Sequence, residues 1–452
     1  MKIVGSLHTP EFAGDLANSI LTKIKKVILF MFLGLLPVPL VTWTIAASTV
    51  AAMFVKPRRI PEPVWACLGA GLVLALHLIT FNQALGAIAK GYDVYLFLAG
   101  MMALAELARR EGVFDWLAHI AMRAARGSRT RLFALVYLVG IVVTAVLSND
   151  ATAVVLTPAV YAVVRKAKGD PLPYLFACAF IANAASFVLP ISNPANLVVF
   201  GDKIPALIPW LQIFLLPACT AILATYVAVL GLFWRNLQGS IPRVSVTRPL
   251  SKAEKLTVLG VIGTGGTLLF CSAMGHPLGA PTCITAFATT LAVMFCDREA
   301  PWAVCQGVAW SVLPLVGGLF VIVEALDATG GLRLVRNALD RLTEWTPMAA
   351  HLATAFGFAA ISNLINNLPV GLIGAGALHA SPVSGRLTNA MLIGIDLGPN
   401  LSVTGSLATI LWLIALRREN LRVSAWTFLK IGVIVMPVAL LLAALVLCLT
   451  SQ

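Results

Sequence analysis

The sequence predicts an all-α polytopic membrane protein built as an inverted structural repeat, and three observations support that prediction. Apolar residues make up 59% of the 452 positions and charged residues only 11%, whereas soluble domains carry about 25% charged residues. Two long apolar runs are interrupted by polar residues, at 148–150 and at 366–367. The order of segments in the first half recurs in the second at an offset of about 215 residues. Together these features indicate about ten crossings, two of them interrupted, plus two re-entrant hairpins.

The chain divides into a tail, two repeats and a linker. Residues 1–36 form an N-terminal tail without a convincing signal-peptide cleavage site, so we expect it to be retained; it contains either no crossing or one extra membrane segment in residues 24–36. The first repeat, residues 37–234, and the second, residues 256–452, flank a basic cytoplasmic linker at residues 235–255. Apolar spans run at about 27–55, 64–80, 92–108, 171–200, 208–233, 256–273, 279–296, 303–325, 386–416 and 425–449.

Two further kinds of segment complete each half. The stretches 131–164 and 349–378 are long enough for two half-helices each but have polar centres, so we interpret them as re-entrant hairpins. The segments 112–126 and 330–343 are amphipathic and are expected to lie in the membrane interface. Each half then contains five true crossings. Because five is odd, the second half inserts upside down, as in the inverted repeats of secondary transporters.

The basic residues of the loops predict the orientation. If the loop at 56–63 is cytoplasmic, that side carries twenty-one Lys and Arg residues and the other side carries six. By the positive-inside rule, the first hairpin then enters the membrane from the cytoplasm and the second enters it from outside. The net charge of +13 therefore reflects membrane topology and gives no support to nucleic-acid binding.

The polar residues at the hairpin tips are the first candidate site. A backbone break at membrane depth must be buried in protein or line a polar cavity, because lipid offers no hydrogen-bond partner. Ser148, Asn149 and Asp150 form the break of the first hairpin. Asn366 and Asn367 form that of the second. We expect both tips to line a shared substrate chamber.

The next-to-last span of each half carries a second polar interruption. Residues 181–197 contain two prolines, and residues 394–409 contain a proline and a glycine, which break or kink helices. Each break frees N–H groups at the positive end of a half-helix. The candidate substrate-binding residues in these breaks are Asn183, Ser192, Asn193, Asn196, Asn400, Thr404, Gly405 and Ser406. The alternative, that single Ser or Thr side chains only bond neighbouring helices, does not account for Asn and Pro in corresponding breaks.

Asp150 and Asp396 are the two carboxylates expected deep in the bilayer, one in each half. A charged group there is costly and marks a functional site by default. Burial favours the uncharged acid, which would let both side chains exchange protons near neutral pH. The other interpretation is that they cap helix ends or pair with a buried cation. No nucleotide-binding loop, metal cluster or nucleophilic triad accompanies them, so we expect no cofactor, no fixed metal and no enzymatic activity.

Four motifs resemble the bacterial arsenite permease, or arsenical pump membrane protein, of the ion-transporter superfamily. They are SNDATAVVLTP at 148–158, SNPANL at 192–197, NNLP at 366–369 and DLGPNLSVTGSLATILW at 396–412. The resemblance covers the chain from about residue 40. It implies export of trivalent arsenite and antimonite in exchange for protons across the bacterial inner membrane. In some systems it also implies a separate cytoplasmic ATPase partner.

One departure from that family bears on proton coupling. The permeases compared often have an acidic residue where this chain has Asn183, and Asn183 corresponds to Asp396 in the internal repeat. The resemblance therefore leaves the proton role here to Asp150, Asp396 or both. Trivalent arsenic hydroxide is largely neutral near pH 7, so hydrogen-bonding Asn, Ser and Thr side chains suit it.

Three rival functions remain open from the sequence. A sodium/proton antiporter or a dicarboxylate or citrate carrier would use the same fold. A gated channel for small neutral solutes belongs to another class, and concentrative transport would exclude it. An intramembrane hydrolase using both aspartates is the weakest, because no supporting motif accompanies them.

Overall fold

The structure is a computed structural model that describes residues 37–55, 60–242, 249–297, 302–379 and 384–450. The expected tail at 1–36 and residues 243–248 of the linker lie outside the described residues. Within the described part the chain is all-α, as the composition predicts, with one isolated β-bridge between Ser128 and Ser240. Six described helices are long and apolar enough to cross a membrane, or up to eight if two bent pairs each count as one span.

The spans of the first half match the predicted segments. They are α2 (Val38–Val55), α3 (Glu62–Ala75), α5 (Tyr92–Arg110), α10 (Leu172–Ala184) continuing into α11 (Pro194–Phe200), and α12 (Leu207–Leu232). Those of the second half are α14 (Lys252–Ala273), α15 (Gly279–Asp297), α17 (Val312–Ala328), α21 (Ser384–Leu397) continuing into α22 (Leu407–Arg418), and α23 (Ala425–Thr450). The short helix η5 (Gly201–Lys203) lies between α11 and α12, and α13 (Trp234–Leu237) follows α12.

Two helices were not expected from the sequence, and they occupy related places. The helix α4 (Phe81–Lys90) begins at a capping box in which Thr80 and Gln83 bond each other's backbone, and it precedes α5 at a 50° bend. The helix α16 (Trp302–Gly307) precedes α17, so the single span expected at 303–325 is divided in two. Both are short and contain few consecutive apolar residues, which is why apolar length alone did not reveal them.

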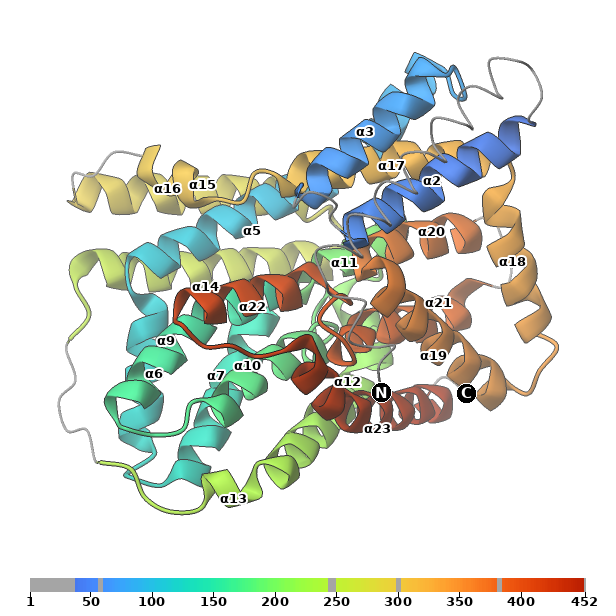
Figure 1. The fold of residues 1–452 in the computed structure, drawn as a ribbon. Coiled ribbons are helices and arrows are strands. Elements are labelled where there is room, and N and C mark those ends of the chain that lie inside the picture. The colour runs from blue at the N-terminus through green and yellow to red at the C-terminus, as the bar shows by residue number, and fades with distance from the viewer. Residues whose placement is uncertain (1–36, 56–59, 243–248, 298–301, 380–383, 451–452) are drawn as a thin grey trace.

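The two amphipathic segments form helices as predicted. These are α6 (Val113–Ala124) and α18 (Gly331–Leu342). Both begin directly after a glycine in the left-handed conformation, Gly112 with φ 72° and Gly330 with φ 77°, where a side chain would be strained. In Figure 1, α6 lies at the left end of the molecule and α18 at the right end. Corresponding helices of the two halves therefore lie at opposite ends.

Each hairpin enters the fold from its own end. The first consists of α7 (Arg129–Val146), the short α8 (Asn149–Ala151), a π-helical turn η3 (Thr152–Leu156) and α9 (Thr157–Lys166). The second consists of α19 (Pro347–Ile365) and α20 (Asn367–His379). Figure 1 shows α7 and α9 at the left and α19 and α20 at the right. The two broken spans are interrupted by the 3₁₀ turns η4 (Pro190–Ser192) and η6 (Gly398–Asn400).

The helix contacts also correspond between the halves. The contact of α5 with α15 is equivalent to the contact of α17 with α3. In the same way, the contact of α2 with α3 is equivalent to that of α14 with α15. The final helices α12 and α23 pack against each other, and each contains an internal proline, Pro217 and Pro437. The helix α10 packs on α12, and α19 and α21 pack on α23, whereas α2 to α5 and α14 to α17 form a second group of helices.

Candidate functional site

The tip of the first hairpin is built from polar caps. The Ser148 Oγ accepts a hydrogen bond from the Ala151 N–H at 3.2 Å, and the Asn149 Oδ1 accepts one from the Asp150 N–H at 2.9 Å. These bonds satisfy N–H groups that a helix start leaves free. Asp150 is only partly buried, and a π-helical turn follows one residue later. Turns of this kind occur frequently at functional sites.

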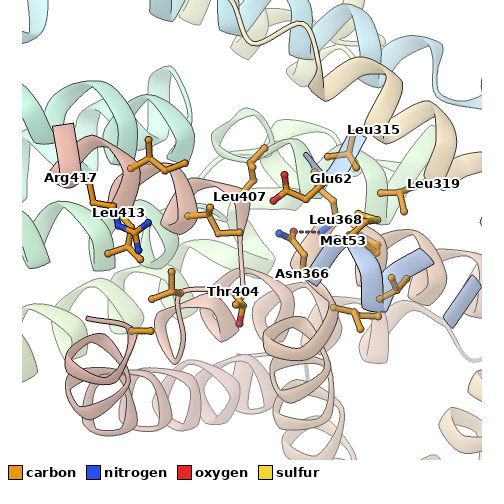
Figure 2. Close-up of a pocket in the computed structure, with 17 residues that line it drawn as sticks. Met53, Glu62, Leu315, Leu319, Asn366, Leu368, Thr404, Leu407, Leu413 and Arg417 are labelled. Carbon is orange, nitrogen blue, oxygen red and sulfur yellow. Dashed lines mark hydrogen bonds between the residues drawn. The ribbon is translucent and has the colours of Figure 1, made fainter. Parts of the chain in front are cut away.

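The tip of the second hairpin is strained. Asn366 has φ 75° and ψ 151°, a backbone region that is essentially reserved for glycine. Its Oδ1 accepts a hydrogen bond from the Leu368 N–H at 3.4 Å, drawn as a dashed line in Figure 2. The Asn367 N–H donates to the Gly405 carbonyl at 3.0 Å, which ties this hairpin to the second broken span.

The first broken span turns around an asparagine. The Asn196 Nδ2 donates to the carbonyls of residues 186, 189 and 190, so this side chain closes the loop between α10 and α11. Asn193 is the N-cap of α11, and its Oδ1 accepts from the Ala195 N–H at 3.0 Å. The Ser192 hydroxyl donates to the Ala145 carbonyl at 3.3 Å and thereby attaches the loop to the first hairpin.

The second broken span is bound to its hairpin through Asn363. The Nδ2 of Asn363 donates to the Gly398 carbonyl at 2.8 Å, and its Oδ1 accepts from the Ser402 hydroxyl at 2.6 Å. The Thr404 hydroxyl donates to the Asn363 carbonyl at 2.9 Å. A side chain on Gly405 would collide with Pro399 and with the same Asn363 amide. The close approach explains why glycine is needed there.

Among the hydrogen bonds that join the broken spans of the two halves, two connect one side chain with another. The Asn183 Nδ2 donates to the Asn400 Oδ1 at 2.9 Å, and the Asn193 Nδ2 donates to the Asp396 Oδ1 at 2.8 Å. Asp396 is fully buried, and its Oδ2 has no hydrogen-bond partner among the described residues. The same Asn193 side chain therefore caps α11 and contacts the buried carboxyl group of the other half.

The four breaks meet at one small cavity of about 20 Å³. Five of the predicted site residues line it: Asn149, Asp150, Asn193, Asn367 and Ser406. The remaining lining residues are Leu98, Pro194, Val312, Leu368, Leu407 and Ala408. We name this space the central cavity. It contains no Lys or Arg among its described lining residues, and the helices α20 and α22 begin at its wall, so its polar groups are amides, a hydroxyl, N–H groups and one carboxyl group.

A larger cavity of about 360 Å³ lies beside it, shown in Figure 2. We name it the vestibule. Its walls are mainly apolar, with Asn366 and Thr404 at the breaks and Glu62 and the exposed Arg417 farther along. Glu62 begins α3 and Arg417 lies in the last turn of α22, so the vestibule lies on the side where α3 begins and α22 ends.

The other predicted site residues lie outside the walls of both cavities. Ser148, Ser192, Asn196 and Gly405 shape the breaks through the bonds described above, and Asn183 and Asn400 link the halves. Asp396 is one hydrogen bond behind the central cavity. Sequence reasoning missed Asn363 as the centre of the second break, although Ser362 and Asn363 repeat the Ser-Asn pair of the first hairpin.

The comparisons with known proteins agree with this architecture. A family described as citrate transporter matches residues 40–395. An arsenical pump membrane protein of Escherichia coli is 29% identical over 409 residues, 85% of this chain and 93% of that protein. Another, from Escherichia coli strain K12, is 30% identical over 344 residues, 73% of this chain and 79% of that protein.

The chain belongs to this citrate transporter family of ion transporters. A crystal structure of the Alcanivorax borkumensis YdaH transporter, described as having an unusual topology, has the same fold with a TM-score of 0.55 at 16% identity; it covers 86% of this chain and 97% of that one. As a member of the citrate transporter family with several apolar helices of membrane-spanning length, the protein is a multi-pass membrane transporter.

Proposed function

We propose that this protein exports trivalent arsenite and antimonite from the cytoplasm in exchange for protons. The observation that carries the proposal is the central cavity, which brings amide and hydroxyl groups of all four breaks together with the carboxyl group of Asp150. A neutral trihydroxide of arsenic or antimony needs hydrogen-bond donors and acceptors and no fixed counter-charge. The relatives named arsenical pump membrane protein support the same substrate.

In this proposal both aspartates carry protons. Asp150 borders the central cavity directly, and Asp396 is connected to it through the Asn193 side chain. An acidic group that lies at a helix break of a membrane transporter and lacks a cationic partner is a candidate proton carrier. A change in the protonation of Asp396 would then alter the hydrogen bonds of Asn193, and with them the cap at the start of α11, because the same amide caps that helix.

The substrate-binding residues follow from the cavity walls. Asn149, Asn193, Asn367 and Ser406 would hold the substrate's hydroxyl groups, and Asn366 with Thr404 would receive it from the vestibule. Ser148, Asn183, Ser192, Asn196, Asn400 and Gly405 would hold these groups in place through the bonds described above.

The proposal includes an inverted repeat in the bacterial inner membrane. Residues 37–234 and 256–452 would be oppositely inserted halves on either side of the linker at 235–255. The positions of α6 and α18 at opposite ends of the molecule support this. Positive loop charge would place the vestibule on the cytoplasmic side. The two hairpins and broken spans would then move as a unit against α2 to α5 and α14 to α17.

The test is arsenite uptake into everted membrane vesicles with an imposed pH gradient and no ATP. We expect proton-driven accumulation, lost in Asp150→Asn and in Asp396→Asn. Undiminished uptake by both variants would refute the proton roles. Uptake that requires ATP and a soluble protein would instead indicate a cytoplasmic ATPase as an obligatory partner.

A citrate or dicarboxylate carrier is the second candidate, favoured by the description of the matching family. The central cavity argues against it, because its described lining residues provide no cationic side chain for a carboxylate substrate. Competition of arsenite uptake by citrate or succinate would favour a carboxylate carrier over an arsenite exporter. Dependence of uptake on sodium would favour sodium coupling over proton coupling.

A further inference from the structure

The vestibule and the central cavity share two lining residues, Leu368 and Leu407. Each leucine directly follows a polar residue of the central cavity, Asn367 in one case and Ser406 in the other. They therefore stand at the starts of the half-helices α20 and α22, one on the hairpin and one on the broken span. Figure 2 shows both side chains at the same space as Asn366 and Glu62.

The two leucines form the boundary between a wide space and a narrow one. Leu368 is 8% exposed and Leu407 is partly buried, with the vestibule of about 360 Å³ on one side and the central cavity of about 20 Å³ on the other. Both side chains are therefore part of the wall of each space. The two leucines thus separate the mainly apolar vestibule from the polar groups of the central cavity.

The first half of the chain lacks this arrangement at the equivalent places. The residue after Asn149 is Asp150, and the residue after Asn193 is Pro194. The leucine pair is therefore a feature of the second half, which is also the half whose tip residues Asn366 and Thr404 face the vestibule.

We infer that Leu368 and Leu407 are specificity-determining residues that form an apolar gate between the vestibule and the central cavity. Hydrophobic constrictions exclude ions because a charged species cannot shed its water there, whereas a neutral solute pays a much smaller desolvation cost. The gate thus favours an uncharged polyhydroxyl solute over inorganic ions, and it limits the leak of protons that are not exchanged for substrate. The inference rests on the proposed function in treating the central cavity as the substrate site.

The test measures access to the central cavity and does not depend on transport. In the full-length chain with its eight native cysteines replaced, Ser406→Cys is labelled by a membrane-impermeant thiol reagent applied from the vestibule side. We expect slow labelling that rises about tenfold or more when Leu407→Ala is added, the effect of a barrier lowered by about 1.4 kcal/mol. Leu413→Ala is the matched control: it makes the same change on the same helix α22, but lines only the vestibule.

A second measurement is the rate of proton leak, made on the protein that keeps its native cysteines. Proteoliposomes under a potassium diffusion potential should leak protons faster with Leu368→Ala or Leu407→Ala than with the wild type or Leu413→Ala. Equal labelling rates with and without Leu407→Ala, or an equal rise with Leu413→Ala, would overturn the gate. Failure of arsenite transport with an intact labelling difference would refute the proposed substrate and leave the gate standing.

Discussion

The two hairpins occupy equivalent places in the fold but differ in chemistry. The first carries a carboxyl group at its tip, Asp150, followed by a π-helical turn. The second carries no acid at its tip; it has a strained asparagine, Asn366, and then a regular helix. One hairpin is therefore suited to proton exchange and the other to holding and admitting a neutral solute.

The hairpins also differ in how they are attached. Asn363 and Asn367 bind the second hairpin to its broken span at Gly398, Ser402, Thr404 and Gly405. Within the described residues of the first half, Ser192 bonds Ala145 near the break and Tyr174 bonds the Arg129 carbonyl at the far end of the helices, so fewer bonds join hairpin and span at the break itself. The second hairpin and its broken span should thus move together more tightly than the first pair.

The largest expected effect is the removal of the carboxyl group that distinguishes the tips. Asp150→Asn should lower proton-driven arsenite uptake by about 100-fold or more, because a positioned proton-transfer group commonly contributes that much. Asp150→Glu should retain part of the activity. Initial uptake rates in everted vesicles measure this. Equal activity of Asp150→Asn and wild type would remove the functional difference between the hairpins.

The next effect compares two glutamates that occupy equivalent positions near the ends of α5 and α17. Glu106 is 9% exposed at its side chain and contacts Arg109 and Arg110, whereas Glu324 is 25% exposed and contacts Lys90. Glu106→Gln should destabilise the protein by about 2 kcal/mol, because buried charge-assisted hydrogen bonds are lost. Glu324→Gln should cost less than about 1 kcal/mol. Thermal unfolding in detergent measures both losses of stability. An equal loss in the two variants would contradict the inference drawn from the difference in burial.

A smaller effect tests the strain at the second tip. Asn366→Gly should stabilise the protein by about 1 kcal/mol, since backbone strain of this kind costs about 1–3 kcal/mol and glycine gives back part of that in chain entropy. Uptake should nevertheless fall, because the amide facing the vestibule is lost. Ser148→Gly, at a first-hairpin position with extended backbone, is the control and should destabilise. Destabilisation by Asn366→Gly would argue against strain.

The smallest effect concerns the hydrogen bond that supports the π-helical turn. The hydroxyls of Thr144 and Thr152 are 2.8 Å apart and fully buried in the first hairpin. Thr152→Val should cost about 1 kcal/mol, the net value of one such hydrogen bond. Tm compared with the exposed Thr267→Val measures it. A loss no greater than in that control would show that the turn does not depend on this bond.

The fold was largely predictable because apolar length and polar interruption are local signals. The breaks at 148–150 and 366–367 and the amphipathic α6 and α18 were read directly from residue order. The helices α4 and α16 were not, since short helices at span ends lack a distinctive apolar length. A bend between α17 and α18 follows from the expected interfacial helix at 330–343, whereas its angle of 76° and the packing of both helices on α20 were not predicted.

The site was predictable in its residue types and less so in its arrangement. Polar residues at broken helices pointed to Asn149, Asp150, Asn193, Asn367 and Ser406, which the structure brings together at one cavity; their role in transport stays a prediction. The bond between Asn193 and Asp396 spans 203 positions, and no local pattern announces such a partner. Leu368 and Leu407 resembled ordinary core residues in the sequence, and only the position of the two cavities distinguishes them.

The small size of the central cavity has a thermodynamic consequence. About 20 Å³ accommodates roughly one water molecule, so a trihydroxide cargo fits only after the four helix starts have spread apart. Part of the binding free energy of the cargo would be spent on that expansion. Binding of the cargo would therefore shift the population toward the widened conformation. A ligand that occupies the pocket without widening it could bind tightly and still never be carried across.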